Sequence, residues 1–207
     1  MKKKMPDNED MDFSNKEEER EFFLDQVRNN GYKYYELKDE YKNDREISLH
    51  ASMQEGEVLG MCPDKFRDDK EFVRQVLVKN PHAYEYVSER LRDDKELTLM
   101  SVKKYGLRLN FASPRLKNDK DVVLGAVTEF GDALAMASAE LRNDNEVVLT
   151  ATLTNEKSFR FASKYIINMV GKENPVDILT RLVNLEKVAQ NLDRELIADK
   201  PNKQIKI

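Results

Sequence analysis

The sequence predicts an all-α fold: an α-solenoid of six 25-residue helix-turn-helix repeats with a long C-terminal capping helix. The first observation is a six-residue phrase that recurs every 25 residues, clearly from residues 41, 66, 91, 116 and 141 and faintly from residue 16. A fixed period of this size is typical of repeat proteins, in which each unit covers the apolar face of the next. The second observation is composition. Charged residues make up 36% of the 207-residue chain, which suits a thin stack with much surface.

The repeats divide the chain into four parts. We expect a disordered segment over residues 1–13 and a repeat domain over 14–171. The capping helix should occupy 172–198, and a disordered tail should follow over 199–207. Six continuous units leave no room for a second domain, so we expect a single stack, of the right-handed type.

The recurring phrase predicts the start of a helix. Numbered from the phrase, position 1 is apolar in copies two to six, position 3 is Asn or Asp, and position 6 is Glu or Asp. This is the spacing of a capping box, in which the first side chain accepts from a backbone N–H of the new helix. Position 4 is Asp in these copies, where the helix dipole favours negative charge. The expected N-caps are Asn43, Asp68, Asp93, Asn118 and Asn143.

The rest of each copy predicts where that helix ends. Apolar residues at positions 7, 9 and 12, with small or apolar residues often at 8 and 11, indicate a helix covered on two sides. Position 16 is glycine in four copies, which predicts a left-handed C-cap with positive φ. These glycines are Gly31, Gly56, Gly106 and Gly131. A second helix of about two turns should follow, and then a turn or one-turn 3₁₀ segment after a serine.

The C-terminal segment changes pattern. Asn174 and Pro175 predict a helix start, and apolar residues then follow at spacings of 4, 3, 4, 3 and 4. They are Ile178, Leu182, Leu185, Ala189, Leu192 and Leu196. We expect this helix to cap the last repeat and the protein to be a monomer. A coiled-coil dimer through residues 175–198 is the alternative that the heptad spacing leaves open.

Two copies carry a family resemblance. LRDDKELTLMSVKKYGLRLNFASPRL from Leu91 and LKNDKDVVLGAVTEFGDALAMASAEL from Leu116 resemble the bacterial and large-virus family called domain of unknown function 4116. The family's unit, about 50 residues long, looks like a pair of the present repeats. The resemblance covers residues 41–165 well and 16–40 weakly, and the copy from Phe66 departs at Arg74 and Pro81. It implies a helical-repeat fold and supplies no catalytic residues.

The sequence contains no constellation typical of an enzyme, so we expect no catalysis, cofactor or metal. His50 and His82 have no metal-ligand spacing and should be surface residues. Cys62 is the single cysteine, and it should be a small buried hydrophobe in a protein of a reducing compartment. No signal sequence or membrane-spanning run is apparent. We expect a cytoplasmic location, with leaderless export not excluded.

Comparison among the copies suggests where a partner binds. Positions 10, 13 and 14 vary freely, and positions 10 and 13 should lie along one outer face. The candidate partner-binding residues are His50, Met53, Gln75, Val78, Met100, Lys103, Thr128, Thr150 and Leu153. We expect a non-catalytic protein-protein interaction module or scaffold, of a bacterial regulatory or effector-like kind, whose partner is another protein.

The alternative function is binding of nucleic-acid phosphate through a basic ridge at position 2. This ridge consists of Lys42, Arg67, Arg92, Lys117 and Arg142. Acidic residues at positions 3, 4 and 6 interleave with these cations and with those at position 5, and the net charge of the chain is −4. We therefore expect a solvated ladder of ion pairs between successive copies and not a phosphate-binding surface.

Overall fold

The computed structural model describes residues 13–198, with the side chains of 193 and 195–198 excepted. Every regular element in this range is an α-helix or a 3₁₀-helix, which confirms the all-α prediction for the described residues. The chain divides into two compact units, one ending at Ser101 and the other beginning at Val102. The predicted segment over 1–12 and the predicted tail over 199–207 lie outside the described residues. Phe13, however, packs on Phe22 with ring centroids 5.5 Å apart.

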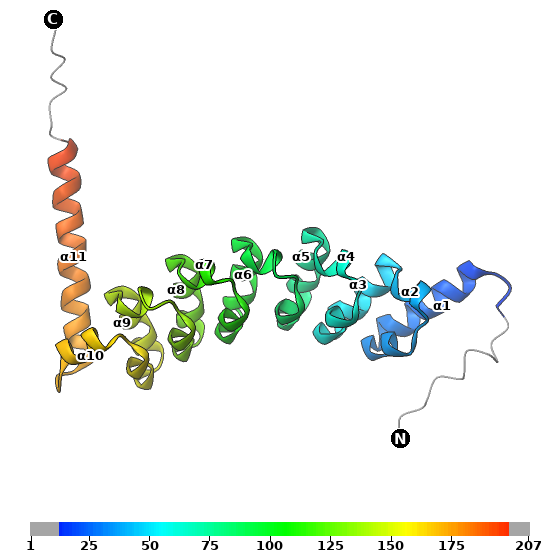
Figure 1. Ribbon diagram of the computed structural model, residues 1–207, viewed down its shortest axis with the longest axis horizontal. Coiled ribbons are helices and arrows are strands. Elements are labelled where there is room, and N and C mark those ends of the chain that lie inside the picture. The colour runs from blue at the N-terminus through cyan, green and yellow to red at the C-terminus, as the bar shows by residue number, and fades with distance from the viewer. Residues whose placement is uncertain (1–12, 199–207) are drawn as a thin grey trace, which may run out of the picture. The chain divides into compact units, whose positions relative to one another are not determined.

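Unit 1 contains ten helical segments among its described residues (Figure 1). They are α1 (Lys16–Asn29), η1 (Gly31–Glu36), α2 (Asp39–Lys42), α3 (Arg45–Gln54), η2 (Gly56–Met61), α4 (Asp64–Arg67), α5 (Lys70–Lys79), η3 (Pro81–Tyr86), η4 (Leu91–Asp93) and α6 (Lys95–Val102), whose last residue opens unit 2. α1 packs on α3 and α3 on α5, while η1 packs on η2 and η2 on η3. The unit is therefore two rows of segments, one of α-helices and one of 3₁₀-helices.

Unit 2 repeats this arrangement and then departs from it. Its elements are η5 (Gly106–Phe111), α7 (Pro114–Lys117), α8 (Lys120–Glu129), η6 (Gly131–Met136), η7 (Leu141–Asn143), α9 (Asn145–Thr154), η8 (Glu156–Phe161), α10 (Lys164–Val170) and α11 (Pro175–Ala198). α8 packs on α9, and η6 packs on both η5 and η8. The helix α11 closes this unit by packing on α9.

A copy of the repeat has three helical segments, as expected from two helices and a one-turn segment after a serine. After the main α-helix come a six-residue 3₁₀-helix and a one-turn helix that carries the apolar residue of position 1. A serine starts several of these one-turn helices, because its hydroxyl accepts from the N–H three residues on. Ser113 Oγ accepts from Leu116 N at 3.2 Å, and Ser138 Oγ from Leu141 N at 3.1 Å. The shortness of the repeat comes from these tight segments, since 3₁₀ runs are short by nature.

The core lies between the two rows of segments. In α5 the residues at positions 7, 8, 11 and 12 are all buried, and they are Phe72, Val73, Val76 and Leu77. The same positions are buried in α8 and α9. Position 9, expected in the core, is only half-buried at Leu99 and Leu124. The buried face therefore centres on 8 and 11 as much as on 7 and 12, as expected of a helix with neighbours on two sides.

The helix cap lies one residue later than predicted. The Asp at position 4 is the N-cap: Asp44 Oδ1 accepts from Glu46 N at 2.9 Å and from Ile47 N at 3.0 Å. Asp144 does the same with Glu146 N and Val147 N, both at 3.0 Å. Position 3 instead ends the preceding one-turn helix, and Asn118 and Asn143 accept from serine hydroxyls 20 residues further on. The position-6 carboxylate of Glu46 binds Arg20 and Arg28.

The prediction of positive φ at the position-16 glycines was wrong. Among the described residues, Gly171 is the one glycine with positive φ, at 62°. The glycines start the 3₁₀-helices and are required by close approach. A Cβ on Gly31 would lie 2.7 Å from the carbonyl oxygen of Ala51, and one on Gly131 would lie 2.5 Å from that of Ala151. Each partner carbonyl belongs to the next α-helix, so the missing Cβ lets successive copies pack closely.

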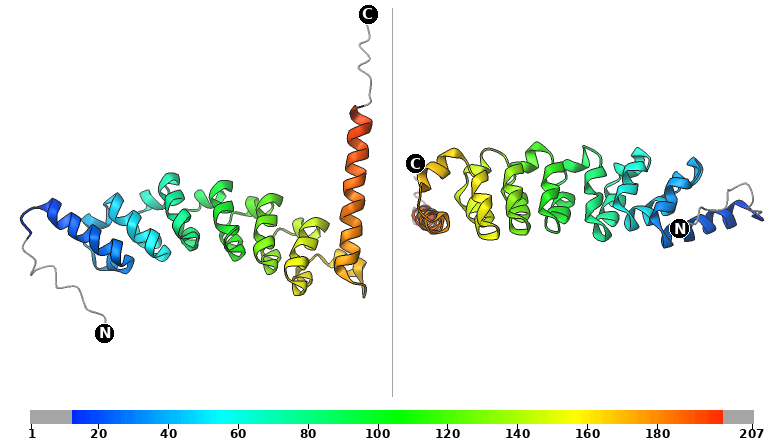
Figure 2. Two further views of the ribbon diagram at one scale, coloured as in Figure 1. Left: turned by 180° about the vertical axis from the view of Figure 1, so that it is seen from behind. Right: turned by 90° about the horizontal axis from the view of Figure 1, so that it is seen from below.

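The C-terminal helix α11 covers the last copy with only its first half. Leu179 and Val183 are buried there, and Asn145 Nδ2 donates to Glu186 Oε1 at 2.7 Å. Beyond these residues α11 extends past the other helices of unit 2 (Figures 1 and 2). Leu185, Val188 and Leu192 are 65%, 56% and 54% exposed. The helix is a cap over its N-terminal turns and a free amphipathic helix after them.

Candidate protein-interaction surfaces

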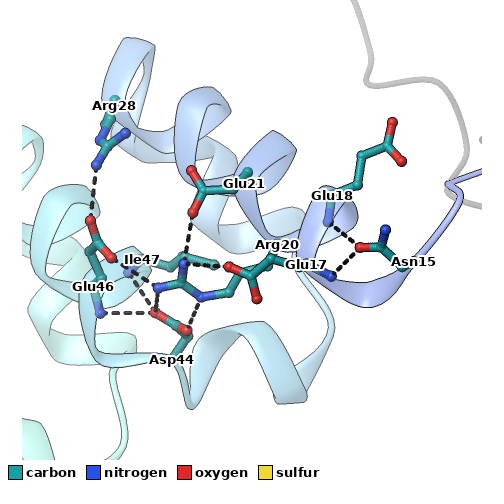
Figure 3. A network of polar contacts seen from close by, with 9 residues as sticks. All are labelled: Asn15, Glu17, Glu18, Arg20, Glu21, Arg28, Asp44, Glu46 and Ile47. Carbon is teal, nitrogen blue, oxygen red and sulfur yellow. Dashed lines mark hydrogen bonds and ion pairs between the residues drawn. The ribbon is translucent and has the colours of Figure 1, made fainter.

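Ion pairs link each α-helix to the next inside a unit. Arg20 Nε donates to Asp44 Oδ2 at 2.7 Å, and an Nη donates to Glu46 Oε2 at 2.9 Å (Figure 3). The position-5 cation of one copy thus binds the position-4 cap and position-6 carboxylate of the following copy. Lys70 does the same with Asp94 at 2.8 Å and Glu96 at 2.9 Å.

Unit 2 contains the same link. Lys120 Nζ lies 2.8 Å from Asp144 Oδ2 and 2.9 Å from Glu146 Oε2. The last copy has Asn145 where the others have a cation at position 5, and this residue binds Glu186 of the capping helix instead. These pairs form the ladder that the sequence predicted. Their charges are partly exposed, so each contributes only a fraction of a kcal/mol, up to about 1 kcal/mol.

The ladder fixes the protonation state of the cap residues. Burial alone would raise the pKa of Asp44, but Arg20 and the N–H groups of Ile47 and Glu46 outweigh it and hold the pKa below its usual value. The pKa of Asp94 is lowered in the same way by Lys70 and the Leu97 N–H, against burial. These carboxylates stay ionised through the neutral range and act as structural groups.

The cations at position 2 do not form a free ridge in either unit. In unit 1, Arg92 Nε donates to Val87 O at 2.9 Å and Nη2 to Glu85 O at 2.6 Å. Arg67 pairs with Asp64, and the side chains of Lys42, Lys117 and Arg142 are half-buried. Guanidinium groups that already bind backbone carbonyls have fewer donors left for phosphate. Binding of nucleic acid remains the alternative function. The position-2 cations offer it little support, because they are paired or half-buried.

In unit 1 the predicted partner-binding residues differ in exposure. Val78, at the end of α5, is 59% exposed. Met53 on α3 and Met100 on α6 are half-buried, as are His50 and Gln75 at position 10. Val78 at position 13 therefore faces solvent more than the position-10 residues, whereas Met53, also at position 13, is covered as much as they are. We call Met53 and Val78 the position-13 stripe of unit 1.

In unit 2 the same contrast holds. Leu153 on α9 is 64% exposed, and Thr128 on α8 is exposed, whereas Thr150 is half-buried. Lys103 is exposed, but it follows α6 and is not part of a helix. Thr128 and Leu153 are the position-13 stripe of unit 2. The structure does not unite all nine predicted residues into one site, since those at position 10 are partly covered.

Position 14, which also varies among copies, has a structural role. Gln54 Nε2 donates to the carbonyl oxygen of Arg28 at 3.1 Å. Thr154 Oγ1 lies 3.5 Å from the carbonyl oxygen of Thr128. Both contacts join the end of one α-helix to the end of the preceding one. Variation among copies at this position therefore does not by itself indicate a binding surface.

The residues considered for chemistry show no catalytic arrangement among those described. His82 is exposed and His50 half-buried, and the described residues contain no group of three or more His, Cys, Asp or Glu that could hold a metal. Cys62 is buried, as predicted, with Sγ 3.5 Å from Ser52 Oγ. Burial raises the pKa of its thiol, so it is a weak nucleophile.

A shallow pocket in unit 1 has a volume of 480 Å³. Its lining residues are Asp64, Arg67, Asp68, Val87, Ser88, Glu89 and Arg92. Arg67 pairs with Asp64 inside it, and Asp68 accepts from Ser88 and pairs with Arg90. Arg92 binds backbone carbonyls, as described above. The pocket is the junction of two one-turn helices and presents no unpaired charge cluster to a ligand.

Sequence reasoning left one exposed surface open as an alternative and missed another. The second half of α11 leaves Val188 exposed beside Leu185 and Leu192, although Val188 does not belong to the heptad series. The 3₁₀ row of unit 1 exposes Tyr32 and Tyr35, whose rings stack with centroids 6.3 Å apart. The signal for the first was available, because the heptad spacing continues well beyond the length of α-helix that one copy can cover.

The family model described as Domain of unknown function (DUF4116) matches the chain four times. The matches cover residues 44–92, 69–117, 94–138 and 119–167, more than half of the chain together. The chain belongs to this family. Each DUF4116 match begins at a position-4 aspartate, namely Asp44, Asp69, Asp94 or Asp119, and consecutive matches start one copy apart. The DUF4116 unit is therefore a pair of copies, as the resemblance implied.

The other comparisons add no relative to this assignment. Neither the curated proteins nor the solved structures gave a match to the chain. The membership confirms a helical-repeat family and carries no activity, since the DUF4116 description names none. Among residues 13–198, no helix combines the length and apolar character needed to cross a bilayer.

Proposed function

We propose that this protein is a non-catalytic protein-interaction module, a helical-repeat solenoid that acts as a scaffold or regulatory factor for another protein. The observation that carries the proposal is the exposure of apolar side chains at position 13. Val78 is 59% exposed in unit 1 and Leu153 is 64% exposed in unit 2. Neither side chain contributes to a core, and apolar atoms at repeated sites on a charged surface are typical of binding surfaces.

The contrast between constant and variable positions supports this proposal. Caps, core and ion pairs recur from copy to copy, which accounts for stability. Position 13 changes chemistry at each copy: it is Arg28, Met53 and Val78 in unit 1 and Lys103, Thr128 and Leu153 in unit 2. A constant frame with a variable outward position is how repeat proteins recognise extended partners. A partner segment with apolar side chains that contact Met53 and Val78 fits the stripe of unit 1.

The proposal is tested by site-specific photocrosslinking from position 78. A photoreactive amino acid in place of Val78 should capture a defined protein in extracts of the native host, and Val78→Glu should abolish co-purification of that protein. Met61→Glu is the matched control, because Met61 is 56% exposed in the same unit but lies on η2. A partner that both variants lose equally, or no captured partner at all, would contradict the proposal.

A further inference from the structure

The second half of α11 presents an apolar face that nothing in the described part of unit 2 covers. Leu185, Val188 and Leu192 lie on adjacent turns, and Ala189 between them is also exposed. Ile178 and Leu182, which precede them in the same heptad series, are half-buried beside α9. The stripe therefore begins beside the cap and continues along the exposed second half of α11, which extends past the other helices of unit 2 (Figure 1).

We propose that this stripe binds the same stripe of a second copy of the chain, so that two α11 helices form a parallel two-stranded coiled coil. The spacing of Ile178, Leu182, Leu185, Ala189 and Leu192 assigns them to heptad positions d, a, d, a and d. A stripe with this register is complementary to itself, because each a or d side chain meets the equivalent one across the two-fold axis.

The charges beside the stripe select the orientation. Arg181 occupies position g and Glu186 the following position e, and both are exposed. In a parallel pair, position g faces position e of the next heptad in the other helix, so Arg181 meets Glu186 of the second copy twice. In an antiparallel pair, the two e positions face each other, and the two Glu186 carboxylates would repel. Charge complementarity therefore favours the parallel pair.

The cap and the pairing surface use different faces of α11, and Glu186, whose Oε1 accepts from Asn145 Nδ2, lies between them. Leu179 and Val183, which contact unit 2, occupy positions e and b. They lie about 110° around the helix from the a/d stripe, at 100° per residue. The helix can therefore hold its own last copy on one face and a second chain on another. The last copies of the two chains would then lie on opposite sides of the coiled coil.

The first test is the molar mass of the full chain as a function of concentration, measured by sedimentation equilibrium. We expect a monomer-dimer equilibrium. Leu185→Glu/Leu192→Glu should raise the dissociation constant by on the order of 100-fold, because it places charges in the seam. Leu153→Glu is the matched control, since Leu153 is 64% and Leu185 65% exposed. If the chain stays monomeric at several hundred micromolar, its dissociation constant is above roughly that concentration, and the proposal is overturned. A dimer that survives the double substitution also overturns it.

The second test addresses orientation. Arg181→Glu should weaken the dimer by on the order of tenfold, and adding Glu186→Arg should restore it. Leu185→Cys should form a disulfide across the two-fold axis under mild oxidation, whereas Lys187→Cys, at the outer position f, should not. Crosslinking at 187 but not at 185, or no rescue by the charge swap, would contradict the parallel arrangement. Cys62 is buried and does not interfere.

Discussion

The hydroxyl of Tyr84 lies 2.7 Å from Oγ1 of Thr98, and the same relationship occurs 50 residues earlier between Tyr34 and Ser48, at 3.1 Å. In both places the tyrosine also donates to a position-2 carbonyl, that of Arg92 or Lys42. The buried tyrosine belongs to alternate copies in unit 1, and the intervening copy has Leu59 at this position. The hydrogen bond thus has the period of the two-copy family unit.

Tyr84→Phe should destabilise unit 1 by about 1 kcal/mol, because the Arg92 carbonyl then loses the hydroxyl that donates a hydrogen bond to it in the core. Burial raises the pKa of Tyr84 to about 12, so its hydroxyl remains a neutral donor throughout the usual pH range. Chemical denaturation followed by circular dichroism measures the change. Tyr32→Phe is the control, since Tyr32 is exposed, and an equal loss in both variants would show that the buried hydrogen bond is not the cause.

Asp44→Ala should cost roughly 1–2 kcal/mol, because it removes the N-cap of α3. Asn43→Ala should cost less, since the Asn43 side chain donates to the carbonyl of Asp39, the first residue of α2, and caps no N–H group of α3. Asp44→Asn separates the two roles of the cap residue, as it keeps an acceptor for the N–H groups and loses the charge that faces Arg20. Thermal unfolding of the three variants ranks their losses of stability. A larger loss for Asn43→Ala would contradict the observed cap.

These two residues also show what sequence reasoning could settle. The period, the all-α class and the ladder between copies follow from charges and apolar residues at fixed spacing, which local chemistry determines. The cap was misplaced by one residue because Asn and Asp at positions 3 and 4 have similar cap preferences. The choice depends on the one-turn helix before it, which uses position 3 for its own C-terminus, and this tertiary arrangement has no separate signal in the sequence.

Gly131→Ala should be strongly destabilising, although Gly131 has no unusual φ. A Cβ there would meet the Ala151 carbonyl at 2.5 Å and Ser158 Oγ at 2.7 Å, so α9 and η8 would have to move apart. Gly125→Ala is the matched control inside α8, where alanine should be neutral or stabilising by about 0.5–1 kcal/mol. The melting temperature should therefore fall in Gly131→Ala and stay level or rise in Gly125→Ala. A neutral Gly131→Ala would show that the copies do not need this close approach.

Acid should weaken unit 1 through its cap residues. The pKa values of Asp44 and Asp94 are lowered in the folded state, as is that of Asp69, where Arg45 and the Phe72 N–H outweigh burial. A lowered pKa means that the stabilisation is fully present above the unfolded value, about 3.9, and is lost as pH falls through the folded one. The melting temperature should thus be level near neutrality and drop steeply below about pH 4. Asp44→Asn should reduce this pH dependence, and an unchanged acid transition would contradict the assignment.

Two leucines of α11 should separate the cap from the pairing surface. Leu179→Ala should destabilise unit 2 by about 2–4 kcal/mol, because Leu179 is fully buried in the cap. Leu185→Ala should leave the stability of the dilute, monomeric chain within about 0.5 kcal/mol of the parent. Unfolding experiments at low protein concentration make this comparison. Equal losses in both variants would show that the second half of α11 also packs on unit 2.

Because Cys62 is buried, its thiol can report local opening of unit 1. The thiol is 4% exposed, is held between Ser52 and the Val58 carbonyl, and is the single cysteine of the chain. A thiol reagent can therefore reach it only when the segment around η2 opens, whether the rest of the chain opens or not. In a stack where each copy touches only its neighbours, such openings need not involve the whole molecule. The rate at which a thiol reagent labels the unmodified protein therefore measures how often the segment around η2 opens without unfolding of the whole chain.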